Sequence, residues 1–419
     1  MEIATKKYRD TSWDFVQANT KTYTHCFHNY PAMMIPQVAE RLITEFGKNA
    51  ALLFDPYCGT GTSLVEANLK GINAIGTDLN PLARLVALAK TTILNIQILD
   101  LYLKEFNDFI FKLLFGLGKP NVVVSNFKNI DYWFDKNIQK RLAIIKHFIE
   151  KIEDNKIKNF FLVAFSETVR DCSWTRNGEF KLYRISEKQR QKFNPDVFSI
   201  MLNKLSRNKK GLIEYIEVVK NKRVFTKIYD FNTVYEKKHI PEETVDLVVT
   251  SPPYGDSRTT VAYGQFSRLS NQWIGIDEAN HVDKKLMGGN IRKNFEKFGI
   301  NIVDDVLTEI SKLDEKRAME VYSFYKDYYK SIKNVASLIK KNGFACYVVG
   351  NRKVKGVTLP TDEITKSFFE SNGFLHIETM IRSIPNKRMP KRNSPTNQMG
   401  VTDNTMNYEY IVIMEKIKA

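Results

Sequence analysis

A short apolar segment near the start of this chain runs directly into a glycine-rich turn, an order of residues that indicates an α/β fold. Residues 51–54 (Ala-Leu-Leu-Phe) predict a buried strand, and Asp55-Pro-Tyr-Cys-Gly-Thr-Gly-Thr62 follows at once. A helix is predicted from Ser63 to Lys70, because Gly71 stands just past its last turn, where glycine ends helices. The segment therefore predicts a strand, a tight turn and a helix in immediate succession.

A second unit of the same kind follows. Residues 73–77 predict a strand that ends at Asp78, and a helix from about Pro81 to Lys90 has proline in its first turn. Continuous apolar runs predict seven strands in all: 51–54, 73–77, 224–229, 245–250, 344–349, 374–381 and 408–414. We therefore expect an α/β fold with a Rossmann-like, doubly wound sheet of seven strands, whose ligand crevice lies at the carboxyl ends of the strands.

The strand at 224–229 comes roughly 130 residues after the second predicted helix, far more than a connection needs. Within this interval, apolar residues repeat at the 4-3-4-3 spacing of an amphipathic helix: Ile138, Leu142, Ile145, Ile149 and Ile152. We therefore expect a large, mainly helical insert over residues 96–222. A second helix is predicted before the strand at 344–349, from the apolar positions Val321, Tyr325, Tyr328, Ile332, Val335 and Ile339.

The chain is strongly basic, with 63 Lys and Arg residues against 47 Asp and Glu residues and a net charge of +16. A balance of this kind favours a polyanionic partner such as nucleic acid, although charge also serves solubility. Residues 181–227 hold 13 Lys and Arg residues but only 4 Asp and Glu residues. This segment is either a surface that contacts phosphates or a solvated helix face, and charge alone does not separate the two.

Cysteine and histidine spacing indicates no metal site. Cys26, Cys58, Cys172 and Cys346 lie far apart, without a Cys-x-x-Cys pair or a zinc-type pairing with histidine. We therefore expect a reducing, cytoplasmic location. We expect no membrane partner, because the longest apolar candidate, residues 85–103, contains Lys90 and Asp100.

The first motif has the parts of a nucleoside site. The glycines of Asp55–Thr62 permit a tight turn and let a ligand lie against bare main chain. No lysine follows Gly61, which disfavours a phosphate-binding loop. Asp78, at the end of the second strand, can accept hydrogen bonds from both hydroxyls of a ribose.

The second motif, Ser251-Pro-Pro-Tyr254, ends the buried strand at 245–250. Two prolines fix the main chain, so that we expect the Pro252 carbonyl to point into the crevice beside the Ser251 hydroxyl. The Tyr254 ring offers a flat stacking surface. These are the parts needed to hold a flipped base by its exocyclic amino group.

Together the two motifs resemble those of the S-adenosylmethionine-dependent amino-methyltransferases of DNA, which modify adenine N6 or cytosine N4 in restriction-modification systems. His25-Cys-Phe-His-Asn-Tyr-Pro31 resembles the segment that packs beside the methionine end of the cofactor in that family. The resemblance implies catalytic roles for Ser251, Pro252, Pro253 and Tyr254. It implies that the following residues bind S-adenosyl-L-methionine, with Asp78 on the ribose and Asp230 near the adenine: Tyr30, Asp55, Pro56, Cys58, Gly59, Thr60, Gly61, Thr62, Asp78 and Asp230.

The family arrangement also predicts how the chain is divided. Residues 1–95 would hold an N-terminal segment and the cofactor-binding half, and 96–222 a basic helical insert that is a candidate for target recognition. Residues 223–419 would form the catalytic half, with an inserted region at 257–318. The implied partners are double-stranded DNA and a cognate restriction endonuclease encoded separately.

The first residue of the catalytic motif favours cytosine N4, because family members that act on adenine usually carry Asp or Asn where this chain has Ser251. Cytosine C5 methylation needs a thiolate nucleophile, usually after a proline, and none of the four cysteines follows one. Adenine N6 remains an alternative. RNA guanine-N2 methyltransferases also share Asp-Pro-Tyr-Cys-Gly-Thr-Gly and Pro-Pro-Tyr-Gly, and a non-catalytic nucleic-acid-binding module is a further alternative.

Overall fold

The computed structural model describes residues 7–118, 120–176, 178–179, 181–237, 239–255, 262–276, 281–384, 392–393, 403–404 and 407–418. Its centre is an eight-stranded sheet in the order β1-β9-β12-β6-β5-β2-β3-β4. Neighbouring strands are parallel except around β12, which runs antiparallel to β6 and β9. The strands are β1 (Lys7–Arg9), β2 (Leu52–Asp55), β3 (Asn73–Thr77), β4 (Thr226–Tyr229), β5 (Val245–Thr250), β6 (Ile339–Val349), β9 (Phe374–Ser383) and β12 (Tyr408–Lys416).

This sheet confirms the α/β class and the doubly wound arrangement, and it has one strand more than the seven predicted. The added strand, β1, has three exposed residues and pairs with β9 at the edge of the sheet. Its sequence, Lys-Tyr-Arg, has no apolar alternation, so a pattern search passes over it. Strand β6 begins at Ile339, five residues before the predicted start at 344. The preceding helix ends at Leu338, so the strand follows it without a loop.

Helices cover both faces of the sheet. On one face lie α1 (Pro36–Phe46) and α2 (Thr62–Leu69), whose apolar side chains pack with Leu53 of β2. On the other face lie α12 (Asn301–Leu313), α13 (Glu315–Leu338) and α14 (Thr361–Glu370), in one apolar cluster with Phe54. Leu53 and Phe54 are adjacent in sequence, so opposite faces of one strand anchor the two cores.

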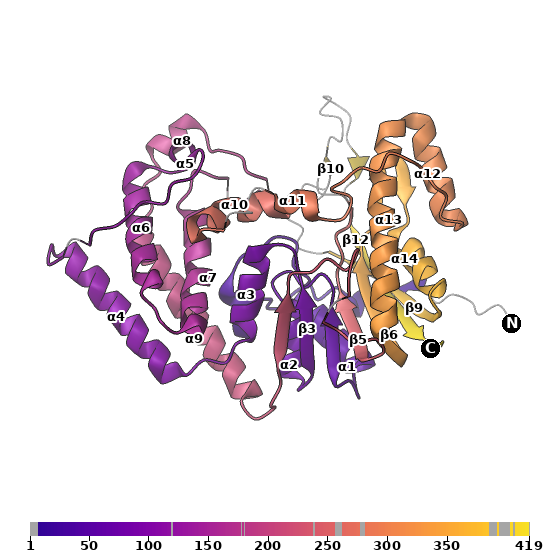
Figure 1. Cartoon of the computed structure of the whole chain (residues 1–419), viewed down its shortest axis with the longest axis horizontal. Coiled ribbons are helices and arrows are strands. Elements are labelled where there is room, and N and C mark those ends of the chain that lie inside the picture. The colour runs from indigo at the N-terminus through magenta and orange to yellow at the C-terminus, as the bar shows by residue number, and fades with distance from the viewer. Residues whose placement is uncertain are drawn as a thin grey trace.

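A lobe of helices packs beside the sheet (Figure 1). It contains the helix predicted from the 4-3-4-3 pattern, α6, whose Ile138, Leu142, Ile145 and Ile149 are buried. Its apolar cluster includes Leu82 and Val86 of α3 (Pro81–Thr91), so the lobe shares a core with the helix that follows β3. After α3, the described helices that precede β4 are α4 (Ile96–Leu114), α5 (Ile130–Trp133), α6 (Lys136–Glu150), α7 (Asn155–Asp171), α8 (Glu187–Gln191) and α9 (Val197–Val219).

One helix from the second predicted insertion, 257–318, packs on this lobe. Phe266, Leu269 and Trp273 of α10 (Tyr263–Ile274) belong to its apolar cluster. The Ser270 hydroxyl donates a hydrogen bond to the carbonyl of Ser166 in α7, at 2.7 Å. In Figure 1, α10 and α11 (Val282–Lys285) cross above the sheet between the lobe and α13. Segments about a hundred residues apart in sequence therefore build one helical layer.

Two 3-10 helices and two small strand pairs complete the described secondary structure. The 3-10 helices are Thr11–Trp13 and Tyr23–Phe27, and the small antiparallel pairs are β7 (Arg352–Val354) with β8 (Val357–Leu359) and β10 (Arg392–Asn393) with β11 (Asp403–Asn404). No helix within the described ranges combines the length and the apolar character that crossing a membrane requires.

Candidate active site

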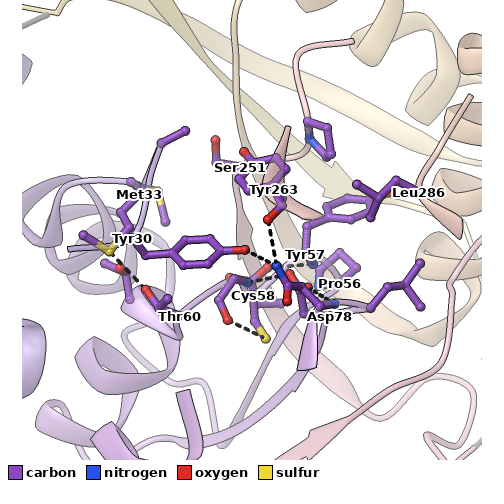
Figure 2. Close-up of a pocket in the computed structure, with 18 of the residues that line it drawn as sticks. Tyr30, Met33, Pro56, Tyr57, Cys58, Thr60, Asp78, Ser251, Tyr263 and Leu286 are labelled. Atoms are coloured by element: carbon purple, nitrogen blue, oxygen red, sulfur yellow. Dashed lines mark hydrogen bonds between the residues drawn. The ribbon is translucent and has the colours of Figure 1, made fainter. Parts of the chain in front are cut away.

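A cavity lies at the carboxyl ends of β2, β3 and β5, where both sequence motifs are found (Figure 2). Eight of the ten predicted cofactor-binding residues line it: Tyr30, Asp55, Pro56, Cys58, Gly59, Thr60, Thr62 and Asp78. From the second motif, Ser251 and Pro253 line the same cavity. The fold therefore brings the two motifs together across one cavity.

The other four predicted residues lie elsewhere. Gly61 precedes α2 with a φ of +77°, and a Cβ atom there would come within 3.0 Å of the Ala87 Cβ, so this position shapes the turn. Asp230 borders a neighbouring depression, with Leu79 and Phe231. Pro252 and Tyr254 are not among the residues that line the main cavity.

Asp55 ties the two motifs to each other. Its Oδ1 accepts hydrogen bonds from the Thr250 hydroxyl at 2.5 Å and from the Tyr57 main-chain nitrogen at 3.0 Å. Its Oδ2 accepts a hydrogen bond from the Ser63 hydroxyl at the start of α2. Burial raises the pKa of this carboxyl to about 6. Since Thr250 directly precedes Ser251, Asp55 holds the second motif in place relative to the glycine turn.

Asp78 and Gly59 have the chemistry that a nucleoside needs. The two carboxylate oxygens of Asp78 accept hydrogen bonds from the main-chain nitrogens of Gly59, at 3.1 Å, and Asn80, at 2.7 Å. Each oxygen keeps a further lone pair for a ribose hydroxyl. A Cβ atom at Gly59 would meet nothing within 4 Å, so the main chain is bare toward open space. These residues fit the adenosine part of S-adenosyl-L-methionine.

The Tyr254 hydroxyl is fixed by two hydrogen bonds. It accepts one from the Ser251 hydroxyl at 3.2 Å and donates one to Oε1 of Glu409 in β12, at 2.9 Å. Glu409 forms an ion pair with Arg382, which is 4% exposed and donates from Nε to the carbonyl of Trp13 at 2.8 Å. Burial and the Glu409 carboxylate raise the pKa of Tyr254 well above its usual value. The second motif is therefore anchored to β12 and, through Arg382, to β9.

Sequence reasoning missed several residues of the cavity wall. Tyr263, from α10, stacks on Tyr30 with ring centroids 5.9 Å apart and an interplanar angle of 14°. Asn80 donates hydrogen bonds to the Tyr30 hydroxyl at 2.7 Å and to the Ser267 hydroxyl at 3.0 Å. Asn80 could have been found, since it stands between Asp78 and Pro81 as a helix cap. Nothing in the sequence around Tyr263 indicates this position.

Part of the basic segment 181–227 is engaged inside the protein. Lys204 is 8% exposed and pairs with Glu167 at 3.1 Å and Asp171 at 2.6 Å. Arg207 also pairs with Glu167, and Lys209 pairs with Asp100 of α4. These three residues already pair with carboxylates of the helical lobe, which favours other positions of the segment for contacts with phosphate.

We expect that a variant lacking all four cysteines, with Cys58→Ala in the glycine turn, keeps measurable activity. All four are buried, and burial raises the pKa of each thiol, which disfavours a thiolate nucleophile. Methyl incorporation by the purified variant measures this. Complete loss of incorporation in a variant that still folds would point to a covalent intermediate.

In the described ranges no cluster of three His, Cys, Asp or Glu residues could hold a metal ion.

Comparison with known proteins gives the class of this site. Residues 2–89 match the family model described as DNA methylase. The type II methyltransferase M.MvaI of Kocuria varians is 40% identical over 427 residues, which cover 96% of this chain and 93% of the relative. The type II methyltransferase M.BsoBI of Geobacillus stearothermophilus is 23% identical over 290 residues, which cover 62% of this chain and 55% of the relative.

The chain therefore belongs to the S-adenosylmethionine-dependent DNA amino-methyltransferases of restriction-modification systems. Among its relatives, M.MvaI matches it over nearly the whole length of both chains. The tRNA (guanine(10)-N2)-dimethyltransferase of Methanothermobacter thermautotrophicus is 38% identical over only 52 residues, 12% of this chain and 16% of the relative. The RNA-type resemblance is thus local, whereas the resemblance to a DNA enzyme is global.

Proposed function

We propose that this DNA amino-methyltransferase modifies the exocyclic N4 amino group of a cytosine flipped out of duplex DNA. The observation that carries the proposal is Ser251, which follows β5 directly and lines the cavity opposite the glycine turn. Relatives that act on adenine usually have Asp or Asn at that position, so adenine N6 is the alternative. We extend the proposal to a role as the modification enzyme that protects DNA in the cytoplasm against a separately encoded endonuclease.

The contacts of Ser251 suit an amino group as substrate. The lone pair of an exocyclic amino group is delocalised into the ring, so the group is a poor nucleophile. The Ser251 hydroxyl donates its hydrogen to Tyr254, which leaves its oxygen lone pairs to accept a hydrogen from the amino group. We propose that the Pro252 carbonyl accepts the second hydrogen of the amino group. Two acceptors on the amino hydrogens would turn its lone pair toward an incoming methyl group.

Bound S-adenosyl-L-methionine supplies an activated methyl group on its sulfonium. The chain itself supplies alignment: Asp78 and the bare main chain at Gly59 hold the adenosine part, and Asp55 fixes the distance between the two motifs. Holding two reactants in line is worth ~7–11 kcal/mol of the barrier. Stacking of the flipped base on Tyr254 would offset the cost of flipping, which is a few kcal/mol.

The basic loop Asn386-Lys-Arg-Met-Pro-Lys-Arg392 is our candidate for phosphate binding together with the basic segment 181–227. The side chains of this loop lie outside the described residues, so this prediction rests on charge alone. Neutralising Lys387, Arg388, Lys391 and Arg392 should weaken binding to all duplexes alike. The logarithm of the binding constant falls linearly with the logarithm of the salt concentration. For every phosphate that is no longer neutralised, the slope of this line should become less negative by ~0.9. Fluorescence titrations over a range of salt concentrations measure the slope, and an unchanged slope would place these charges on a solvated face.

The proposal is tested by sequencing DNA from cells that express the chain, with a method that distinguishes N4-methylcytosine from N6-methyladenine. We expect N4-methylcytosine at one recognition sequence. A matched culture expressing Ser251→Ala tests the assigned acceptor, and it should show reduced methylation at the same sequence. Methylation of adenine would reject the assignment of Ser251 and keep the chain within its family.

A further inference from the structure

A buried lysine lies directly behind the cavity wall. Lys90 of α3 is 0% exposed, and its Nζ donates a hydrogen bond to the Thr60 hydroxyl at 3.4 Å. Thr60 lines the cavity. Among the described residues, Thr60 is the hydrogen-bond partner of this ammonium, and no carboxylate lies within ion-pair distance of it.

Two other buried lysines, Lys204 and Lys416, have the carboxylate partners that Lys90 lacks. Lys204 pairs with two carboxylates. Lys416 pairs with Glu243 and donates to the carbonyls of Ala336 and Ile339. A buried ammonium normally needs this kind of compensation, because removing a charge from water is costly. Lys90 is buried more completely than either, yet it has a single neutral partner at long range.

Glu66 and Cys26 face Lys90 and favour its charged form, but within the described part of the chain neither forms an ion pair with it. Glu66 of α2 forms its hydrogen bond with His25 instead, at 2.8 Å, and burial raises the pKa of Glu66 to about 8. Burial also raises the pKa of the Cys26 thiol. Lys21 adds like charge, and His28 has its pKa lowered to about 4, mainly by burial. Burial lowers the pKa of Lys90 itself to about 7.

The Thr60 hydroxyl lies between the Lys90 ammonium and the cavity. It can therefore extend the positive polarity of Lys90 to a ligand in the cavity. It accepts from Lys90 and donates to the Met33 thioether at 3.1 Å, and thioether sulfur is a weak acceptor that a carboxylate would replace readily. Figure 2 shows Thr60 and Met33 toward one end of the cavity and Leu286 toward the other, with Asp78 between them. The acids Asp55 and Asp78 line the same cavity and would repel a carboxylate, so Lys90 gives the Thr60 end the opposite polarity.

We propose that Lys90, acting through the Thr60 hydroxyl, is a positioning residue that provides the counter-charge for the carboxylate of the cofactor's methionine part. This inference rests on the proposed cofactor site. Because a bound carboxylate favours the protonated lysine, binding of S-adenosyl-L-methionine should take up a proton at pH 8. Little uptake by Lys90 is expected at pH 6, where it is already protonated. The affinity should therefore fall as the pH rises above about 7.

Calorimetric titrations in buffers of different ionisation enthalpy measure this proton uptake directly. We compare the wild type with Lys90→Met, an apolar replacement of similar length that removes a buried charge and should not impair folding. The cofactor's own amino group titrates equally in both, so the difference isolates Lys90. At pH 6 the variant should bind the cofactor roughly tenfold or more weakly, as expected for one charge-assisted interaction.

Three controls separate the alternatives. Lys48→Met, which removes an exposed lysine that is not among the groups facing Lys90, should keep the wild-type uptake. Thr60→Val, which keeps Lys90 and the side-chain shape, should lose the same part of the uptake as Lys90→Met. With decarboxylated S-adenosylmethionine, the wild type and Lys90→Met should behave alike. Equal proton uptake of the normal cofactor by these two proteins would overturn the inference, whereas a wild type that binds no cofactor would overturn the proposed site itself.

Discussion

Replacing Tyr254 with alanine should sharply reduce turnover while the affinity for S-adenosyl-L-methionine stays close to the wild-type value. Base stacking on an aromatic ring is worth ~1–3 kcal/mol, which corresponds to roughly 5-fold to 150-fold in rate if the stack is formed at the transition state. Cofactor affinity should change little, because Tyr254 is not among the residues that line the cavity. Single-turnover methylation and cofactor titration of the same protein measure the two effects.

The matched control is Tyr254→Phe, which keeps the ring and removes the hydroxyl. It should retain much of the activity, with a smaller loss because the hydrogen bonds to Ser251 and Glu409 orient the ring. If Tyr254→Phe were as inactive as Tyr254→Ala, the phenol oxygen would carry the chemistry and stacking would be the wrong explanation. If both variants lost cofactor affinity instead, Tyr254 would belong to the cofactor site.

Asp78→Ala should weaken cofactor binding without unfolding the protein. Losing the charge-assisted hydrogen bonds to a ribose costs roughly 1.5–3 kcal/mol. Burial raises the pKa of this carboxyl, so its charged form costs folding energy and its removal should not lower stability greatly. Calorimetry gives the affinity, and thermal unfolding monitored by circular dichroism gives the stability.

The Asp78→Asn variant separates the effect of the negative charge on cofactor affinity from the effect of side-chain shape. It keeps an oxygen for the main-chain nitrogen of Gly59 or Asn80 but loses the negative charge, so its affinity should fall between those of the wild type and Asp78→Ala. An unchanged affinity of Asp78→Ala would refute the ribose assignment. A large loss of thermal stability in both variants would mean that Asp78 serves mainly to fix the turn at Gly59.

The sequence predicts those parts of the fold that depend on local pattern. Strand 73–77 has the predicted bounds, and α2 and α3 differ from prediction by one residue at their ends, because apolar runs, proline and glycine define them. Strand β1 is missed because its three residues are exposed. The helix before β6 is predicted to run through Ile339, but that residue begins the strand, since apolar periodicity does not mark where a helix gives way to a strand.

The candidate site is predicted only where its residues stand next to a motif. Ser251 and Asp78 follow directly from strand ends, and the structure places both on the cavity wall. Glu409, which anchors Tyr254, is 155 residues away in sequence, and Tyr263 comes from a helix that packs on the distant α7. In the sequence, Lys90 stands out only as an interruption of an apolar run, because its burial depends on side chains from other segments. Tertiary contacts of this kind leave no local signal.

The identity of the methylated nucleoside tests the central claim most directly. Purified chain would be incubated with unmethylated duplex DNA and S-adenosyl-L-methionine carrying an isotopically labelled methyl group, and the DNA would be digested to nucleosides for mass spectrometry. We predict labelled N4-methylcytosine. Labelled N6-methyladenine or 5-methylcytosine with no N4-methylcytosine would contradict the account, and N6-methyladenine would keep the motif chemistry while rejecting the assignment that rests on Ser251.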